Sequence, residues 1–336
     1  MKTTEINNRR YLGNKYRLLP FITQIVSEQC SGVRSVADIF AGTGAVASGF
    51  TAKRLVLNDI LYSNYICHYA WFSPNEYSAA KVTELVSYYN TSSFAEANYM
   101  SDNFADTYFS DAACRQIGNI RADIEHRFDH QDINPRERAL LITALLYAAD
   151  KIANTCGHYD AYRRNSAPKA RLTLAVPTPL PHLNAGNQCF NEDSNQVISH
   201  IEADLVYLDP PYNSRQYCDT FHVLENIARW QQPPVAGIAR KMDRTELKSA
   251  YCTNKATAAF AKLVQSINAP YILMSYNNMS QKGNNRSNAK LNDTDILDIL
   301  HDKGKVQVFT QSFKPFTAGK SALADHAERL FLCTCR

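Results

Sequence analysis

The sequence lacks any long apolar run, and no stretch approaches the roughly 18 residues that a membrane-spanning helix requires. Its first residues are polar and charged, without the apolar segment of a secretory signal. Internal repeats and low-complexity segments are also absent, which argues against a repeat protein and against a disordered chain. These absences predict a globular protein with no membrane partner that works in the cytoplasm.

Metal-ligand spacing is missing as well. The nine cysteines are odd in number and scattered, and the one close pair, Cys333 and Cys335, would fall on one face of a strand. Such a set suits neither a disulfide framework nor a zinc site. We therefore expect no metal site, and we expect all nine cysteines to serve as small buried hydrophobic residues.

A strong charge bias is absent too, since 36 Lys and Arg residues face 32 Asp and Glu residues, for a net charge of +4. This weak excess permits a nucleic-acid partner without requiring one. The length of 336 residues and the hydrophobic fraction of 45% suffice for a large core in one or two domains.

The most informative stretch is residues 204–212, Asp-Leu-Val-Tyr-Leu-Asp-Pro-Pro-Tyr. Its apolar part predicts a buried parallel strand, which must end at Asp209 because the two prolines cannot donate to a strand ladder. Asp209, Pro210, Pro211 and Tyr212 would then present a carboxylate and an aromatic ring at the carboxyl edge of a sheet. Open α/β sheets bind ligands at that edge, so this tetrad is the first candidate for a catalytic motif.

A second motif lies near the N-terminus. Residues 36–40 predict a strand that leads into Gly42-Thr43-Gly44, a glycine-rich turn expected between a strand and a helix. A further strand at 55–57 leads to Asp59, whose carboxylate would accept hydrogen bonds from the two hydroxyls of a ribose. Asp38, just before the turn, would attract a cationic group rather than a pyrophosphate. The pattern therefore favours S-adenosylmethionine over a nicotinamide dinucleotide as cofactor.

Two insertions interrupt the predicted sheet. Residues 61–186 form a long and mostly helical insertion, in which 156–181 mixes basic and aromatic residues with prolines. That mixture suits phosphate contact and base stacking, although an ordinary surface loop has the same composition. Residues 231–256 form a second, smaller insertion that is also basic.

The remaining strands complete an α/β pattern. Residues 188–190 predict a third strand, and Glu192 or Asp193 beyond it would accept a hydrogen bond from the amino group of a cofactor adenine. The spacing favours Asp193. Further strands are predicted at 271–275, 306–309 and 329–333, the last two as an antiparallel pair.

In their order along the chain, these motifs resemble those of the alpha group of DNA amino-methyltransferases, the Dam-like N6-adenine enzymes. The resemblance covers most of the chain and rests on residues 10–15 (Arg-Tyr-Leu-Gly-Asn-Lys), Asp38-x-Phe40-x-Gly42-Thr43-Gly44, Asn58-Asp59 and Asp209-Pro210-Pro211-Tyr212. It implies a Rossmann-like α/β fold with a seven-stranded, mostly parallel sheet and an antiparallel C-terminal hairpin. Residues 1–60 and 187–336 would then be the catalytic domain, and 61–186 an inserted, largely helical target-recognition region.

The resemblance also implies roles for individual residues. Tyr11 and Lys15 would help to hold the cofactor, with Lys15 near its carboxylate, and Phe40, Gly42 and Gly44 would line its methionine part. Together with the residues derived above, the predicted cofactor site comprises Tyr11, Lys15, Asp38, Phe40, Gly42, Gly44, Asp59 and Asp193. The resemblance places a basic DNA-contacting residue at Arg10. The composition of 156–181, and not the resemblance, makes Arg163, Arg164 and Lys169 the other candidates for contact with duplex DNA.

The implied reaction is site-specific methylation of DNA at adenine N6, as in modification enzymes whose system partner is a restriction endonuclease that they need not touch. Asp209 and the carbonyl of Pro210 would accept the two N6 hydrogens and so make the amine more nucleophilic. Tyr212 would stack on the flipped base. An RNA adenine or the N4 amine of cytosine stays open as the target, as does a DNA-binding protein with an inactive methyltransferase core.

Overall fold

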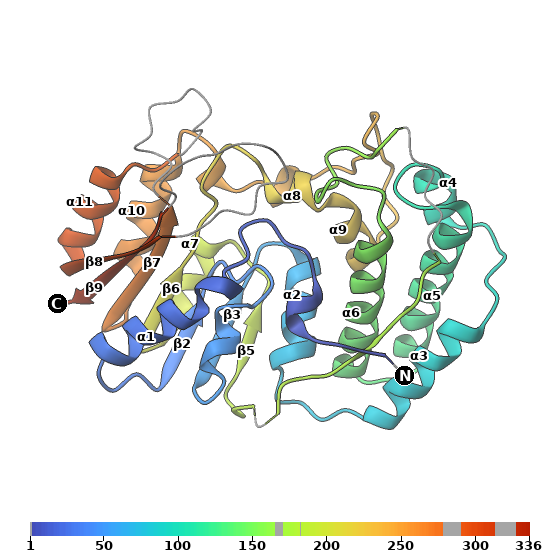
Figure 1. Ribbon diagram of the computed structural model, residues 1–336, viewed down its shortest axis with the longest axis horizontal. Helices are drawn as coiled ribbons and strands as arrows, with labels where there is room; N and C mark the ends of the chain where they lie inside the picture. Colours follow the sequence, from blue (N-terminus) through green and yellow to red (C-terminus); the bar gives the residue numbers. More distant parts are fainter. Residues whose placement is uncertain (1, 165–170, 182, 278–289, 313–326) are drawn as a thin grey trace.

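Figure 1 shows the computed structural model of the chain, which describes residues 2–164, 171–181, 183–277, 290–312 and 327–336. Its centre is a seven-stranded sheet in the order β5-β3-β2-β6-β7-β9-β8. The strands from β5 to β7 in this order are parallel, and β9 runs antiparallel to both of its neighbours. The strands span Gln188–Phe190 (β5), Arg54–Asn58 (β3), Ser35–Asp38 (β2), Leu205–Leu208 (β6), Tyr271–Asn277 (β7), Ala327–Cys335 (β9) and Gly304–Ser312 (β8). The predicted sheet and its closing hairpin are confirmed.

The central strands β2 and β6 are buried at every residue. Such burial is expected of parallel strands whose two faces are both covered by helices. Alternate residues point to opposite faces, so that Val36 and Leu205 join one core cluster while Ala37 and Val206 join the other. The sheet is therefore the middle layer of a three-layer sandwich.

Helices cover both faces of this sheet. One face packs against α7, α10 and α11, and the other against α1 and α2. The α-helices span Leu19–Gln29 (α1), Tyr62–Phe72 (α2), Ala79–Thr91 (α3), Tyr99–Phe104 (α4), Asp111–Asp129 (α5), Pro135–Ile152 (α6), Ser194–Val197 (α7), Tyr217–Thr220 (α8), His222–Arg229 (α9), Ala256–Ser266 (α10) and Asp293–Lys303 (α11). Short 3-10 helices lie at Ile6–Asn8, Tyr16–Leu18, Ala47–Phe50, Ile198–His200, Thr245–Leu247 and Ala250–Cys252.

The helices of the first insertion form a second lobe beside the sheet (Figure 1). Its central helix, α6, begins with a capping box in which the Asn134 and Glu137 side chains satisfy each other's backbone N–H groups. One continuous cluster of buried side chains runs from Leu57 in the sheet through Trp71 to Leu141 in α6. Helix α9, which follows the Asp-Pro-Pro-Tyr tetrad in the chain, packs on α2 and α6 in this lobe. The inserted region thus shares its core with the sheet.

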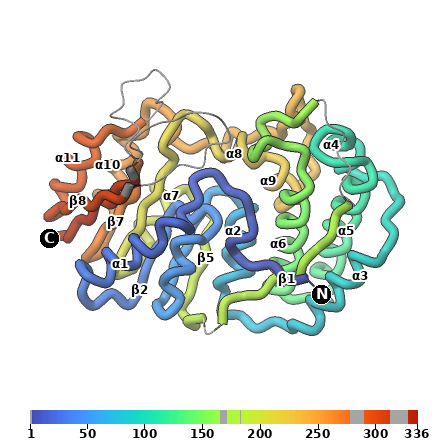
Figure 2. The backbone as a smooth tube through the Cα atoms, viewed as in Figure 1, coloured from blue at the N-terminus to red at the C-terminus, as the bar shows by residue number. Residues whose placement is uncertain are grey.

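The N-terminal segment ties the two lobes together. Strand β1 (Thr3–Thr4) pairs in parallel with β4 (Val176–Pro177), and Figure 2 shows this pair beside the helical lobe. The chain then returns to the sheet, where α1 packs on one face. Residues 10–15 lie between these two anchors, and their loop turns at Gly13, whose φ is +80°.

The helix expected after the glycine turn is a wrong prediction, since only the 3-10 turn Ala47–Phe50 follows. The crossover from β2 to β3 spans residues 39–53, and the glycine turn occupies its first part, up to Gly44. The turn also lies directly under α1, because a Cβ added at Gly49 would approach Leu19 Cδ1 to 2.5 Å. The close packing against α1 is thus the observed constraint on this segment, which forms a 3-10 turn.

The expectation for the cysteines is only partly right. Six are buried, but Cys156 is exposed and Cys189 and Cys335 are half-buried. Among the described residues, no group of three or more His, Cys, Asp or Glu side chains is arranged to hold a metal ion. Within the same ranges, no helix combines the length and the apolar character needed to cross a membrane.

The functional edge of the sheet follows from its strand order. Strand β2 pairs with β3 on one side and with β6 on the other, so the chain leaves their carboxyl ends in different directions. A crevice forms at such a switch point in open α/β sheets. The glycine turn, Asp59 and the Asp-Pro-Pro-Tyr tetrad follow these three strands directly and therefore meet at one place.

Candidate active site

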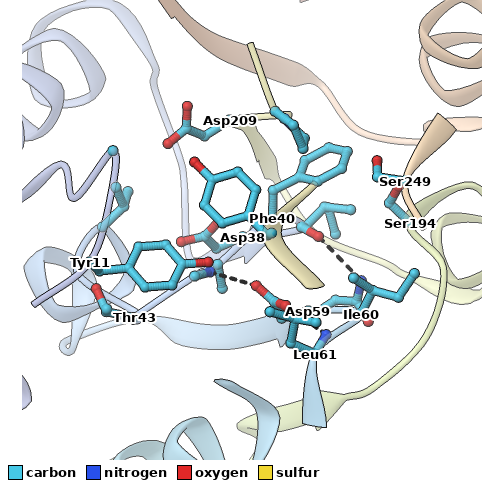
Figure 3. Close-up of a pocket in the computed structure, with 18 of the residues that line it drawn as sticks. Tyr11, Asp38, Phe40, Thr43, Asp59, Ile60, Leu61, Ser194, Asp209 and Ser249 are labelled. Atoms are coloured by element: carbon cyan, nitrogen blue, oxygen red, sulfur yellow. Dashed lines mark hydrogen bonds between the residues drawn. The ribbon is translucent and has the colours of Figure 1, made fainter. Parts of the chain in front are cut away.

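A cavity opens at the carboxyl ends of β2, β3 and β6, with a volume of about 860 Å³ including its mouth. Figure 3 shows Tyr11, Asp38, Phe40, Asp59 and Asp209 together in the cavity. The lining comes from segments far apart in the sequence, at 11–15, 38–46, 58–61, 192–194, 207–217 and 247–249.

The glycine turn forms the floor of this cavity. Gly42 has a φ of +54°, and a Cβ there would lie 3.0 Å from Cε1 of the Tyr11 ring. His68 Nε2 donates a hydrogen bond of 2.8 Å to the Gly42 carbonyl and fixes the turn from behind. Gly44 is not among the residues that line the cavity and lies against Phe72. This position does not favour the predicted contact between Gly44 and the methionine part of the cofactor.

Replacing Gly44 with alanine is expected to lower the free energy of unfolding by roughly 2–4 kcal/mol, because strain at positive φ and overpacking add up. The φ of Gly44 is +79°, and its Cβ would lie 2.8 Å from Phe72 Cε2. Gly32→Ala is the matched control, with a φ of +71° and no atom within 4 Å of the added Cβ. Urea unfolding of both variants measures the difference, and equal losses would contradict the steric part.

His68 makes stability depend on pH. Burial lowers the pKa of His68 to about 4, against an ordinary value of 6.5. The unfolded chain therefore takes up this proton first, and the contribution of neutral His68 to stability is lost as the pH falls from about 6.5 to 4. Compared with His68→Gln, the wild-type chain should lose up to about 3 kcal/mol more over that window. Denaturant unfolding at pH 7 and pH 4 tests this, and parallel losses in both proteins would refute it.

Asp59 joins β3 to the glycine turn. Its Oδ2 accepts a hydrogen bond of 2.9 Å from the Gly42 N–H, and its Oδ1 accepts one of 2.8 Å from the Leu61 N–H. Burial raises the pKa of Asp59 to about 6, although these two N–H groups favour the charged form. Each oxygen keeps a lone pair that can accept a hydroxyl, so the arrangement is compatible with the ribose contact expected from the sequence.

Asp38 is a buried acid that borders the cavity. Its side chain is 2% exposed, and among the described residues its Oδ1 has no hydrogen-bond partner. Burial, followed by the nearby Asp209 and Asp59 carboxylates, raises the pKa of Asp38 well above its ordinary value. A buried carboxylate oxygen without a partner is costly, and a cationic ligand would relieve this cost.

Tyr11 forms a flat wall of the cavity. Its ring stacks on Phe221 with a centroid distance of 4.6 Å and an interplanar angle of 3°, and its hydroxyl accepts a hydrogen bond from Asn64. The buried guanidinium of Arg9 lies 5.7 Å from the Tyr11 ring centroid. The tyrosine predicted from the sequence is thus held rigidly by α9, α2 and its own loop.

The carboxylate of the tetrad is engaged by Lys15. Lys15 Nζ lies 2.9 Å from Asp209 Oδ2 and 3.5 Å from Oε1 of Glu328. Burial alone would lower the pKa of Lys15, but the two carboxylates outweigh it and hold that pKa above its ordinary value. Burial raises the pKa of Asp209, and Lys15 opposes that rise. The expected position of Lys15 near a cofactor carboxylate therefore competes with an ion pair inside the protein.

Tyr212, the last residue of the tetrad, has a side chain that other residues hold in place, so its ring is not a free surface for base stacking. Its hydroxyl lies within hydrogen-bond distance of two carboxylate oxygens, Asp209 Oδ1 at 2.5 Å and Glu328 Oε1 at 2.9 Å, and can donate to one of them at a time. Its half-buried ring packs edge-on against Tyr276 at 4.6 Å. Pro211 lines the cavity and Pro210 is buried beneath it. Tyr212 itself is not among the residues that line the cavity, and Lys15 Nζ lies 4.6 Å from the centroid of its ring.

Two acids lie at the opposite end of the cavity. Asp193 and Glu192 both border it, next to Ser194. Asp193 also caps α7, because its Oδ1 accepts a hydrogen bond from the Asn195 N–H at 2.9 Å. Either carboxylate remains available to an adenine amino group, so the choice between them made from spacing stays a prediction.

The residues predicted to contact DNA lie outside this cavity. Arg10, Arg163 and Arg164 are exposed, and Lys169 lies outside the described residues. The loop that carries Arg163 is anchored by hydrogen bonds between its backbone and Asn154.

The two insertions also contact each other. Lys241 of the second insertion pairs with Asp160 of the first at 2.8 Å, and Arg244 pairs with Asp219 at 2.7 Å. These two cations are therefore used within the protein. They hold the second insertion against the first and against α8.

Sequence reasoning missed Glu328 and Asn64. Glu328 contacts Lys15 and Tyr212, which both contact Asp209, and Asn64 donates a hydrogen bond to Tyr11. Both lie within ordinary amphipathic elements, where a single polar residue gives no signal. Their roles arise only from contacts between segments distant in the chain, in β9 and α2.

Comparison with known proteins agrees with this geometry. Residues 11–280 match the family model of the D12 class N6 adenine-specific DNA methyltransferases. The chain is 34% identical over 294 residues to modification methylase StsI of Streptococcus sanguinis, covering 80% of this chain and 44% of that protein. It is 28% identical to modification methylase LlaI of Lactococcus lactis subsp. lactis, covering 96% of this chain and 53% of that one.

A shorter relative matches along its whole length. The type II methyltransferase M.NlaIII of Neisseria lactamica is 28% identical, with 94% of this chain and 95% of that protein covered. The chain thus spans about half the length of StsI and LlaI and nearly all of M.NlaIII. With a glycine turn, two acids and an Asp-Pro-Pro-Tyr edge around one cavity, and with a family match over 11–280, the chain belongs to the D12 class N6 adenine-specific DNA methyltransferases.

Proposed function

We propose that this chain transfers a methyl group from S-adenosylmethionine to N6 of an adenine that is flipped out of duplex DNA at a specific site. The observation that carries the proposal is the position of Asp209 and Pro211 at the cavity that also contains Asp38 and Asp59. A carboxylate suited to an amine and two acids suited to a cationic nucleoside lie within one enclosed space. Family membership and the relatives named as modification methylases support the same reaction.

The residues of the cavity fit S-adenosylmethionine. When bound, this cofactor supplies an electrophilic methyl group on a sulfonium. The unpartnered Oδ1 of Asp38 would face a cationic group of the ligand, and Asp59 would accept from the ribose hydroxyls. Tyr11 and Phe40 would enclose the methionine side, and Asp193 or Glu192 would accept from the adenine amine.

The tetrad would act on the target amine. In adenine the N6 lone pair is delocalised into the ring, which makes the amine a poor nucleophile. Asp209 and the Pro210 carbonyl would accept its two hydrogens and shift the nitrogen toward a tetrahedral, more reactive state. The Tyr212 ring would hold the flipped base, and alignment with the methyl group would supply much of the acceleration.

The exposed basic residues would position the duplex. Arg10, Arg163 and Arg164 are exposed side chains whose charge suits phosphate contact. Lys241 bridges the two insertions, so that both would approach DNA as one surface. We further propose a modification role beside a restriction endonuclease, because the relatives are named modification methylases.

Transfer of label tests the function. Purified protein is incubated with tritiated S-adenosylmethionine and unmethylated duplex DNA, and the DNA is digested to nucleosides. Label is expected in N6-methyladenine, and sequencing of the modified DNA should show one recurrent motif. Label in N4-methylcytosine, preferred labelling of structured RNA, or no label despite cofactor binding would each overturn the proposal.

A further inference from the structure

Glu328 lies beside the catalytic tetrad. It lies in β9 opposite Asn277 of β7, and the two-residue period of the strands brings it to the same face as Ser275. Its Oε1 accepts hydrogen bonds from Ser275 Oγ at 2.7 Å and from the Tyr212 hydroxyl at 2.9 Å. Its side chain is only 10% exposed. A buried glutamate therefore lies next to the residues at which the proposed methylation would release a proton.

The Tyr212 hydroxyl connects this glutamate to Asp209. It lies 2.5 Å from Asp209 Oδ1 and 2.9 Å from Glu328 Oε1, but a hydroxyl carries a single hydrogen. It can therefore donate its hydrogen to one carboxylate and accept a proton from the other carboxyl group. Among the described residues these contacts form an unbroken path from Asp209 to Glu328.

Charges around the path favour movement away from Asp209. Lys15 lies nearer to Asp209 Oδ2, at 2.9 Å, than to Glu328 Oε1, at 3.5 Å. The ammonium therefore stabilises the ionised form of Asp209 more strongly than that of Glu328. Among the described residues, Glu328 also lies near the phenol of Tyr207 in β6, which is neutral because burial raises its pKa. A proton taken up at Asp209 is thus drawn toward Glu328.

We propose that Glu328 is a positioning residue for Tyr212 and the final acceptor, within the protein, of the proton that N6 loses during methylation. This inference rests on the proposed function. The N6 lone pair forms the bond to the methyl carbon, and the electrons of the broken carbon–sulfur bond remain on sulfur. One N6 proton passes to Asp209, Asp209 passes a proton to the Tyr212 oxygen, and the Tyr212 hydrogen moves to Glu328. N6 has lost one proton, Glu328 has gained one, and Asp209 and Tyr212 are unchanged.

Single-turnover methylation by Glu328→Gln tests this route. Glutamine keeps the size and an oxygen acceptor for Tyr212 and Ser275 but cannot take a proton. The rate is expected to fall 10- to 100-fold with little change in the affinities for DNA and S-adenosylmethionine. Toward acid pH, the rate of the variant should also decline less steeply than the wild-type rate, because the variant lacks one of the two ionising carboxyl groups.

Two further variants separate proton transfer from structure. Glu328→Ala should be rescued by added formate or acetate, with the stronger base giving more rescue, whereas a purely structural glutamate would not respond in this way. Ser275→Ala removes one hydrogen bond to Glu328 and should keep both the acid limb and most of the rate. An unchanged rate and pH profile in Glu328→Gln would overturn the inference, as would a slow Glu328→Ala that carboxylates do not rescue. Wild-type protein that methylates no DNA would instead refute the proposed function.

Discussion

Asp209→Asn is expected to slow methyl transfer by roughly 10³-fold while leaving the affinity for S-adenosylmethionine within a few-fold of wild type. The amide keeps the shape of the side chain but has only one acceptor oxygen and no charge. In the buried site, 2.9 Å from Lys15 Nζ, that charge is the main difference between the two side chains. The amine would then lose the acceptor that makes its nitrogen nucleophilic. Cofactor affinity should persist because Asp38 and Asp59 stay in place.

The measurement is a single-turnover rate with enzyme in excess over DNA, together with calorimetric titration of the cofactor. Asp298→Asn, an exposed position on α11, is the matched control for the same chemical change away from the site. It should be indistinguishable from wild type in both assays. A rate for Asp209→Asn within tenfold of wild type would contradict the assigned role, and so would a large loss of cofactor affinity.

Asp38→Asn is expected to weaken the binding of S-adenosylmethionine by roughly 10- to 100-fold, which corresponds to the loss of one charge-assisted hydrogen bond in a buried site. The stability of the free protein should not fall. Burial holds the pKa of Asp38 well above its ordinary value, so the ionised carboxylate is unfavourable until a cation joins it. Asp38→Asn therefore costs the free protein no charged interaction but removes a favourable charged contact in the complex.

Proton release on binding gives an independent test. A cation that ionises Asp38 should expel a proton, which calorimetry in buffers of different ionisation enthalpy detects. The experiment is done above pH 7.5, because Asp59, whose pKa is raised to about 6, is then already ionised. The release should disappear in Asp38→Asn. Comparison with S-adenosylhomocysteine, which keeps the amino group but lacks the sulfonium, identifies the cation. Unchanged affinity for both ligands would refute a contact with Asp38.

The position of the site could be read from local sequence. The Asp-Pro-Pro-Tyr tetrad ends a buried strand because prolines cannot continue the ladder, and the glycine turn follows another such strand. The carboxyl ends of parallel strands meet at one edge, so these motifs had to converge. The helix expected after the glycine turn did not form, and the close packing of this segment under α1 is a tertiary constraint that local sequence does not show.

The chemistry of the site depended on longer-range contacts. Residue type and order along the chain were sufficient to indicate Asp209, Asp59 and the glycine turn, because each lies within a few residues of the strand that positions it. The pairing of Lys15 with Asp209 and the arrival of Glu328 beside Tyr212 depend on how the N-terminal loop and β9 are brought to that edge. No local sequence pattern predicts these two contacts, because they depend on sheet pairing and on packing between distant segments. The Asp-Pro-Pro-Tyr motif thus predicted where an amine would react. Only the tertiary structure showed the lysine and the second carboxylate that determine the charge around Asp209.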